Sequence, residues 1–137
     1  MCIRDSIWGA GIGGLETFQN EVLGFAAGNG TPRFNPFMIP KMIPDIAPGI
    51  ISIRNGFRGP NFATVSACAS SANALIDGLN YIRLGHADVI VSGGSEAGVS
   101  ISGIGGFNAL HALSTSCLLY TSPSPRDATL SRMPSSA

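Results

Sequence analysis

Residues 61–94 read NFATVSACASSANALIDGLNYIRLGHADVIVSGG, and this stretch decides the fold class. Residues 61–67 are mostly apolar or β-branched, as a short strand requires, and residues 69–84 carry apolar side chains at three- and four-residue steps, as a helix does. Residues 87–92 form an apolar run before a Gly-Gly pair, which is typical of a buried parallel strand. A strand, a helix and a strand over about thirty residues make a βαβ unit. The sequence therefore predicts an α/β fold.

Two further helices are expected upstream of this unit. Apolar residues at helical spacing predict a helix over 15–25 that ends near Gly28, and the prolines of 31–40 predict an extended loop. Residues 41–55 also have helical spacing, but Pro48 would interrupt a helix there. We therefore expect this second helix to be kinked or to start late.

The two ends of the chain differ in character from the part between them. Residues 1–6 show no apolar periodicity, and from about residue 116 the chain becomes rich in Ser and Pro. Both flanks resemble translated sequencing-adapter sequence, with a genuine disordered tail as the alternative for the second. We expect a non-native flank over 1–6, part of one domain over 7–115, and a non-native or disordered tail over 116–137. Cys68 is then the only thiol in the domain segment.

The composition argues against several classes of function. Eight basic and eight acidic residues balance, so no overall field favours nucleic acid or an anionic membrane. The apolar runs are shorter than the roughly 18 residues of a membrane span, and no secretory signal is recognisable. The three cysteines lie far apart, which suits neither a zinc site nor a disulfide framework. We expect no metal, no cofactor, no nucleic-acid partner and no membrane insertion, and a cytoplasmic location, or an organelle in a eukaryote.

Cys68 lies where the predicted strand of 61–67 gives way to the predicted helix of 69–84. Such a bend lifts a side chain from the carboxyl edge of a sheet, where open α/β sheets place their ligands. A helix N-terminus also favours an anionic sulfur, and the small neighbouring residues leave room for a thioester. Most lone cysteines are small buried hydrophobes, so a structural role is the alternative to a nucleophile.

Six short motifs carry a resemblance to a known family. They are Gly11–Leu15 (GIGGL), Asn35–Phe37 (NPF), Gly56–Pro60 (GFRGP), Ser66–Cys68 (SAC), Ala87–Glu96 (ADVIVSGGSE) and Gly105–Leu110 (GGFNAL). In order and spacing they resemble the β-ketoacyl-acyl-carrier-protein synthase II family of the thiolase-like superfamily, over essentially all of 7–115. The resemblance implies part of the N-terminal half of a thiolase-like fold, with βαβ units around a mixed sheet.

The resemblance also implies a reaction, the decarboxylative Claisen condensation of fatty acid biosynthesis. Cys68 would accept an acyl group from acyl carrier protein as a thioester, and its backbone N–H would form half of an oxyanion hole. Malonyl-acyl-carrier-protein would then lose carbon dioxide and attack the acyl-enzyme. Ile12 and Phe107 match positions that line the acyl pocket. The strand of 62–67 matches one that pairs with its twin in a homodimer.

The histidines and the lysine that such a synthase uses would lie beyond residue 115. His86 and His111 match neither histidine position, and we interpret both as surface residues. The chain by itself is therefore expected to lack condensing activity.

Three alternative functions and one alternative residue role remain open. A polyketide ketosynthase usually carries Asp-Thr-Ala before the cysteine, whereas Val65-Ser66-Ala67 precede Cys68, and a thiolase would use coenzyme A thioesters. Gly9, Gly11 and Gly14 formally satisfy a dinucleotide-binding fingerprint, but only Ile7-Trp8 stand before it as a strand, and no acidic residue follows at the right distance.

Glu96 could be a general base, although we expect a buried structural carboxylate that accepts turn N–H bonds.

Overall fold

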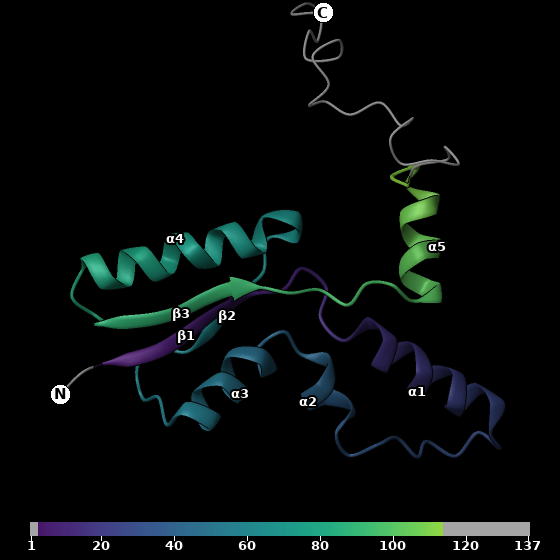
Figure 1. Cartoon of the computed structure of the whole chain (residues 1–137). Coiled ribbons are helices and arrows are strands. Elements are labelled where there is room, and N and C mark those ends of the chain that lie inside the picture. Colours follow the sequence, from purple (N-terminus) through teal and green to yellow (C-terminus); the bar gives the residue numbers. More distant parts are fainter. Residues whose placement is uncertain (1–2, 114–137) are drawn as a thin grey trace, which may run out of the picture. The chain divides into compact units, whose positions relative to one another are not determined.

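The computed structural model describes residues 3–113 of the chain (Figure 1). They fall into two compact units, one up to Gly103 and the other from Ile104 onward. The helices and strands, in chain order, are β1 (Arg4–Gly9), α1 (Leu15–Ala27), α2 (Met38–Met42), α3 (Ile46–Asn55), β2 (Phe62–Thr64), the 3₁₀ turn η1 (Ala67–Ala69), α4 (Ser70–Arg83), β3 (Val89–Gly94) and α5 (Ile101–Ala109).

The first unit is built on a three-stranded sheet in the order β2-β1-β3. Both pairings of the central strand are parallel: Ile7 of β1 is opposite Phe62 of β2 and Ser92 of β3. The sequence β2–α4–β3 is thus a βαβ crossover, and the predicted α/β class is confirmed. No antiparallel strand joins this sheet within residues 3–113.

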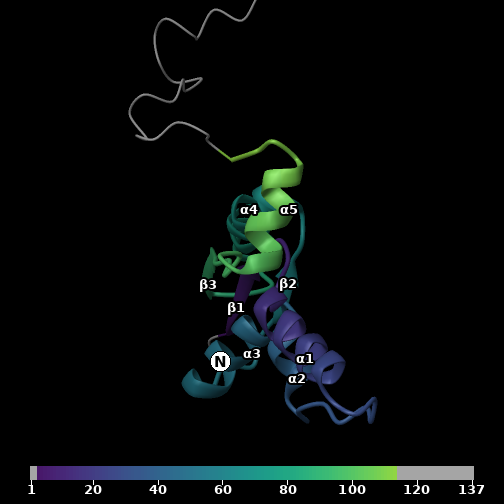
Figure 2. The ribbon, with the colours of Figure 1, turned by 90° about the vertical axis from the view of Figure 1, so that its right-hand side faces the viewer.

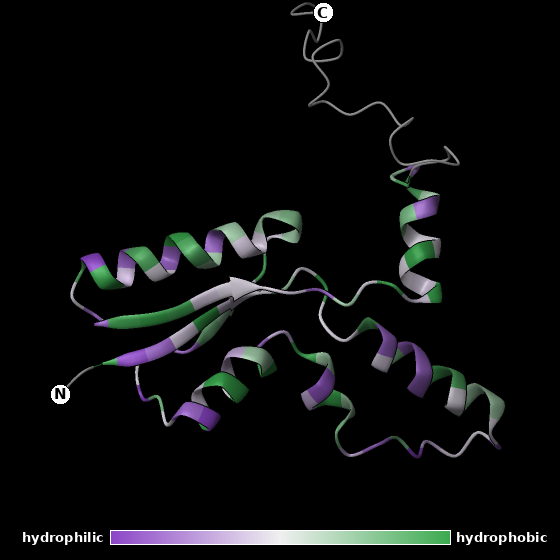
Figure 3. Cartoon of the chain, viewed as in Figure 1, coloured by the Kyte–Doolittle hydropathy of each residue, from purple (hydrophilic) through white to green (hydrophobic). Residues whose placement is uncertain are grey.

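Helices cover both faces of the sheet, and the core lies between them. α4 packs on β1 and β3, while α3 packs on β1 and β2 from the opposite face, as the two perpendicular views show (Figures 1 and 2). Ile7 and Ala74 are fully buried between these layers. Many large apolar side chains nevertheless stay exposed, including Leu79 of α4 and Val91 of β3. In Figure 3, green segments alternate with purple and white ones along α4 and cover the first part of β3. The core within the described residues is therefore thin.

The second expected helix starts late, which was one of the two outcomes expected. α3 begins at Ile46, which places Pro48 in its first turn, where a backbone N–H has no partner within the helix. Pro48 is buried against the sheet and causes no interruption. The loop predicted over 31–40 is shorter than expected, because the five-residue helix α2 begins at Met38.

The central strand β1 was not predicted. It begins at Arg4, inside the range 1–6 that was expected to be a flank, and so a full strand precedes the glycine loop where only Ile7-Trp8 were expected. Its first residues are hydrophilic (Figure 3), yet Asp5 and Ser6 are buried. Ser6 Oγ donates to Pro48 O at 2.9 Å, and Asn61 Nδ2 donates to Asp5 Oδ1 at 2.8 Å. Hydrogen bonds to these partners take the place of apolar packing at the start of β1. The strand therefore lacks the apolar pattern by which strands are recognised in a sequence.

Candidate functional site

The three parallel strands end at the same edge of the sheet, and each leads into a segment that contributes to the candidate site. β1 continues into the glycine loop of residues 10–14, β2 into the turn of residues 65–69, and β3 into residues 95–97. Ligands of open α/β sheets bind beyond the carboxyl ends of the strands. The described structure therefore places its candidate chemistry at this edge.

Cys68 lies between β2 and α4, as the sequence predicted. The strand is shorter than expected, because β2 ends at Thr64 and not at Ala67. It is a free, exposed thiol in the middle of η1, two residues before Ser70, the first residue of α4. The preceding residue, Ala67, has a φ of 49°, a left-handed conformation that is uncommon for a residue with a side chain. Backbone strain of this kind persists where the surrounding structure enforces it, often at functional sites. The bend thus holds the cysteine outward from the strand end.

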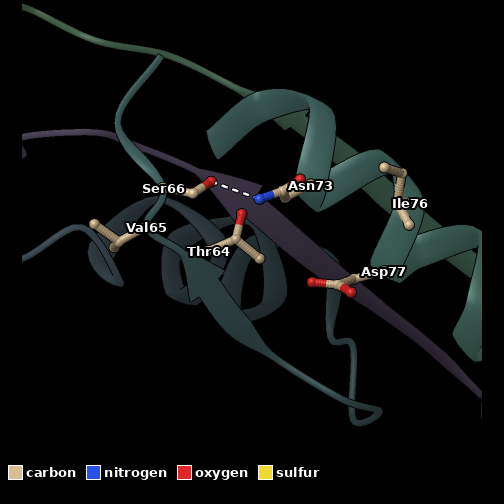
Figure 4. Close-up of a pocket in the computed structure, with 6 residues that line it drawn as sticks. All are labelled: Thr64, Val65, Ser66, Asn73, Ile76 and Asp77. Atoms are coloured by element: carbon tan, nitrogen blue, oxygen red, sulfur yellow. Dashed lines mark hydrogen bonds between the residues drawn. The ribbon is translucent and has the colours of Figure 1, made fainter. Parts of the chain in front are cut away.

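Polar side chains, and not glycine, hold this bend. Ser70 Oγ accepts from the Ser66 N–H at 2.9 Å and donates to Ala67 O at 2.7 Å. Thr64 Oγ1 donates to Ser70 O at 2.8 Å, and Asn73 Nδ2 donates to Ser66 Oγ at 2.7 Å. Figure 4 shows Asn73 on α4 facing Ser66 on the segment after β2. Sequence reasoning missed these residues, although short polar side chains that bond nearby backbone are a known turn signal.

Replacing Ser70 with alanine is expected to destabilise the turn. Ser70 is 3% exposed, and Ser70→Ala removes both hydrogen bonds of its hydroxyl, leaving the Ser66 N–H without that acceptor. We expect a loss of about 2–3 kcal/mol in the free energy of unfolding, measured by urea denaturation. Ser71→Ala is the matched control, because Ser71 is exposed, and it should change stability by no more than about 0.5 kcal/mol. Equal effects of the two substitutions would contradict the role given to Ser70.

Two glycines let the start of α4 lie directly on the strand ends. A Cβ added to Gly9, the last residue of β1, would be 2.4 Å from the backbone carbonyl carbon of Ser70. A Cβ added to Gly94, the last residue of β3, would be 2.6 Å from Ser71 Cβ. Both distances are under 3.0 Å, closer than Cβ atoms essentially ever come to atoms they are not bonded to. Glycine is therefore required at these two positions for the Cys68 turn to sit where it does.

Glu96 connects the loop after β3 to the glycine loop after β1. Its Oε2 accepts from the N–H of Gly11 at 2.6 Å and of Ile12 at 2.7 Å, and its Oε1 accepts from the N–H of Gly13 at 3.1 Å. The expected structural role, a carboxylate that accepts N–H bonds, is confirmed, and both oxygens are occupied. The expected burial is wrong: Glu96 is exposed, because it reaches across to a separate loop at the sheet edge.

These bonds also bear on the dinucleotide alternative. The glycine loop, which carries the dinucleotide-binding fingerprint, does follow a strand, contrary to the expectation from the sequence. However, the N–H groups of Gly11, Ile12 and Gly13 point to Glu96. In a nucleotide site such N–H groups bind a phosphate, and a carboxylate in that place would repel one. The geometry of the loop therefore argues against dinucleotide binding.

The glycine loop lies beside the Cys68 turn. A Cβ added to Gly11 would be 3.1 Å from the carbonyl oxygen of Ala67. Ile12, the next residue, is 45% exposed. Phe107 lies on α5 in the second unit, and its place in a pocket stays a prediction.

The two histidines are both exposed, as expected. His86 follows the C-terminus of the 14-residue helix α4, whereas Cys68 precedes its N-terminus. At 1.5 Å per helical residue, about 20 Å separates them. His111 belongs to the second unit. No described histidine of the first unit is therefore within reach of the Cys68 sulfur.

Two open depressions flank the site within the first unit. One, of about 320 Å³, lies along β2 and α4 and is lined by Thr64, Val65, Ser66, Asn73, Ile76 and Asp77 (Figure 4). The other, of about 270 Å³, lies beside Glu96 and is lined by Lys41 of α2, by Ile46 and Ala47 of α3, and by residues of the neighbouring loops. Across residues 3–113, no group of three His, Cys, Asp or Glu side chains could hold a metal ion. None of the helices in the same range has the length and apolar character to cross a bilayer.

Comparison with known proteins gives the family. The model of the β-ketoacyl synthase N-terminal domain matches residues 6–128. A 3-oxoacyl-[acyl-carrier-protein] synthase 2 of Staphylococcus aureus is 40% identical over 126 residues, 89% of this chain and 30% of the relative. The chloroplastic 3-oxoacyl-[acyl-carrier-protein] synthase I of Hordeum vulgare is 41% identical over 106 residues, 77% of this chain and 23% of the relative. The chain thus spans less than a third of the length of these relatives.

A solved structure with the same fold is the ketosynthase of a type II polyketide synthase in complex with its acyl-carrier protein. It superposes with a TM-score of 0.68 at 21% identity, over 74% of this chain and 29% of that chain. The family match continues past residue 115, and the boundaries expected at 6 and 115 stay predictions. With the glycine loop, the Cys68 turn and the parallel βαβ unit all within the matched range, the chain belongs to the β-ketoacyl synthase family, within its N-terminal domain.

Proposed function

We propose that Cys68 is the acyl-accepting nucleophile of a 3-oxoacyl-[acyl-carrier-protein] synthase. The observation that carries this proposal is an exposed thiol on a bend after a parallel strand, at the sheet edge where ligands bind. The Cys68 sulfur gives up its proton and attacks the carbonyl carbon of an acyl-carrier-protein thioester. The tetrahedral intermediate collapses, the carrier thiol leaves with a proton, and an acyl-Cys68 thioester remains.

The backbone near Cys68 supports the stabilisation of this intermediate. Ser66 is the N-terminal cap of η1, so Cys68 is in its first turn, where backbone N–H groups lack partners within a helix. The Cys68 N–H is proposed as one donor to the developing oxyanion. Ile12, in the loop beside Ala67, and Phe107 are proposed to line the pocket for the acyl chain. Apolar walls suit a fatty chain, and their size would limit its length.

The complete reaction is proposed as a decarboxylative Claisen condensation. Malonyl-acyl-carrier-protein loses carbon dioxide, and the resulting carbanion attacks the carbonyl carbon of acyl-Cys68. The Cys68 thiolate leaves and regains a proton, and a 3-oxoacyl carrier thioester is formed.

The 137-residue chain is expected to carry out acyl transfer and not condensation. Condensation needs groups that polarise the malonyl thioester, and of the two histidines in the chain, His86 is about 20 Å from Cys68 and His111 matches no catalytic position. Mass spectrometry should show one acyl group on Cys68 after incubation with acyl-carrier-protein thioester. Further addition of malonyl-carrier protein should yield no 3-oxoacyl product and no carbon dioxide. Product formation above a protein-free blank would contradict this prediction.

A fatty-acid role is proposed over a polyketide role. Val65-Ser66-Ala67 before Cys68 and Ala69 after it differ from the usual polyketide pattern, and both relatives quoted above carry the name 3-oxoacyl-[acyl-carrier-protein] synthase. The same transfer assay distinguishes the two roles. Saturated acyl donors should react faster than 3-oxoacyl donors of equal length, and the reverse order would favour the polyketide role.

A homodimer is proposed to form through β2. This strand is at the edge of the described sheet, the segment 62–67 carries no charged residue, and Val65 is 61% exposed. Unprotected edges of this kind pair readily with another strand. Sedimentation analysis of the chain should give a dimer, whereas a monomer at micromolar concentration would contradict the proposal.

The three separate cysteines support a reducing compartment, and we propose that the protein is located in the cytoplasm.

A further inference from the structure

We propose that Glu96 is a positioning residue that fixes the glycine loop beside the Cys68 turn and so restricts the length of the acyl chain accepted there. The inference rests on the proposed acyl transfer to Cys68. Glu96 itself is not proposed to contact the acyl group. It acts through the backbone of Gly11, Ile12 and Gly13.

Three hydrogen bonds carry the first step. The carboxylate of Glu96 accepts from three consecutive N–H groups, at 2.6, 2.7 and 3.1 Å, across 83–85 positions of sequence. The bonds to a charged acceptor are stronger than bonds between neutral groups. A loop whose consecutive N–H groups all point to one carboxylate has little freedom to rotate. The carboxylate therefore determines the backbone orientation at Ile12.

The second step is that the glycine loop lies next to the Cys68 turn. Gly11 has the carbonyl oxygen of Ala67 beside it, 3.1 Å from where its Cβ would lie, and Ala67 directly precedes Cys68. A shift of the loop thus moves Ile12 relative to the nucleophile. Ile12 is a branched apolar residue with free volume around it, since 45% of its surface is exposed. Its position sets how much room an acyl chain has beside the sulfur.

The third step is that the residue before Glu96 is anchored to the end of β1. The preceding Ser95 donates its backbone N–H to Gly9 O at 3.0 Å, and its Oγ accepts from Trp8 Nε1 at 2.9 Å. These contacts join the loop after β3 to the end of β1 independently of the carboxylate. Removing the charge of Glu96 should therefore loosen the glycine loop without detaching the segment that carries Glu96.

The substitution Glu96→Gln tests the inference. A glutamine has one acceptor oxygen, and its NH₂ group would face an N–H donor, so at least one of the three bonds is lost. In the 137-residue chain, amide hydrogen exchange at Gly11, Ile12 and Gly13 should become about tenfold faster or more. Glu16→Gln makes the same chemical change at an exposed position of α1 and should leave exchange at these three residues unchanged.

Acyl transfer supplies the second measurement. Relative to a four-carbon donor, the rate of Cys68 acylation by a twelve-carbon donor should rise about fivefold in Glu96→Gln. Ile12→Ala should give a shift in the same direction, and the double variant should show less than the product of the two changes, because Glu96 acts through Ile12. A uniform loss of rate for both donors, or multiplicative effects in the double variant, would overturn the inference.

The outcomes separate this inference from the proposed function. If the unsubstituted chain takes up no acyl group from any donor, the proposed function fails, and the chain-length part of the inference fails with it. If acylation proceeds but Glu96→Gln changes neither exchange nor the donor ratio, only the inference fails. If Glu96→Gln does not fold, as judged by circular dichroism, Ile12→Ala alone decides: an unchanged donor ratio then overturns the inference.

Discussion

Cys68→Ser is expected to lower acyl transfer about 10³-fold or more, because the chain then has no thiol at the bend between β2 and α4. Serine preserves the shape of the side chain and its place in η1, so the fold should be unaffected. The loss would therefore report on nucleophilic character and not on packing. The measurement is the mass increase of the protein after incubation with an acyl-carrier-protein thioester.

The control for this experiment uses the other two cysteines. A variant with Cys2→Ser and Cys117→Ser should be acylated as fast as the unsubstituted chain, and proteolytic mapping should place the group on Cys68. If Cys68→Ser retains transfer within a factor of two, the nucleophile lies elsewhere and the proposed function loses its basis.

Gly9→Ala is expected to destabilise the protein by about 3–5 kcal/mol, because the new methyl group would lie 2.4 Å from the backbone of Ser70. Backbone atoms cannot move aside as the end of a flexible side chain can. Either the start of α4 must shift away from β1 or the strand end must distort. Urea denaturation gives the free energy, and far-UV circular dichroism shows whether the helix content survives.

Gly24→Ala is the matched control. Gly24 is inside α1, and an added Cβ would meet no atom within 4 Å. Alanine is the better helix former, so this variant should gain up to about 1 kcal/mol. Equal destabilisation by the two substitutions would show that the close approach of α4 to Gly9 is not what limits that position. A folded Gly9→Ala protein should also acylate Cys68 more slowly, because the Cys68 turn would shift together with the start of α4.

The sequence predicted the βαβ unit and the position of Cys68 because both depend on local patterns. Apolar spacing identified α4 and β3, and the change from strand to helix identified the bend. The central strand escaped prediction because Asp5 and Ser6 fill buried positions, and their partners Pro48 and Asn61 come from elsewhere in the chain. No local pattern encodes such a pairing.

The contacts that organise the site were harder to predict for the same reason. Glu96 was expected to bind N–H groups, but which loop supplies them depends on the strand order β2-β1-β3. The conformation of Ala67 also follows from its surroundings: a Ser70 hydroxyl bonds its carbonyl, and Gly11 lies against it. Residue types suggested a bend at this point, and the fold determined how sharply the chain turns.

The parallel pairing of β1 has a consequence for the order of folding. Ile7 pairs with Phe62, 55 positions later, and Arg4 pairs with Val89, 85 positions later. Long-range pairing of this kind slows folding, because the intervening chain must be ordered before any contact rewards it. During synthesis on the ribosome, the thiol emerges well before Val89 and Glu96. The nascent chain therefore carries its reactive sulfur for a time before the loop beside it can be fixed.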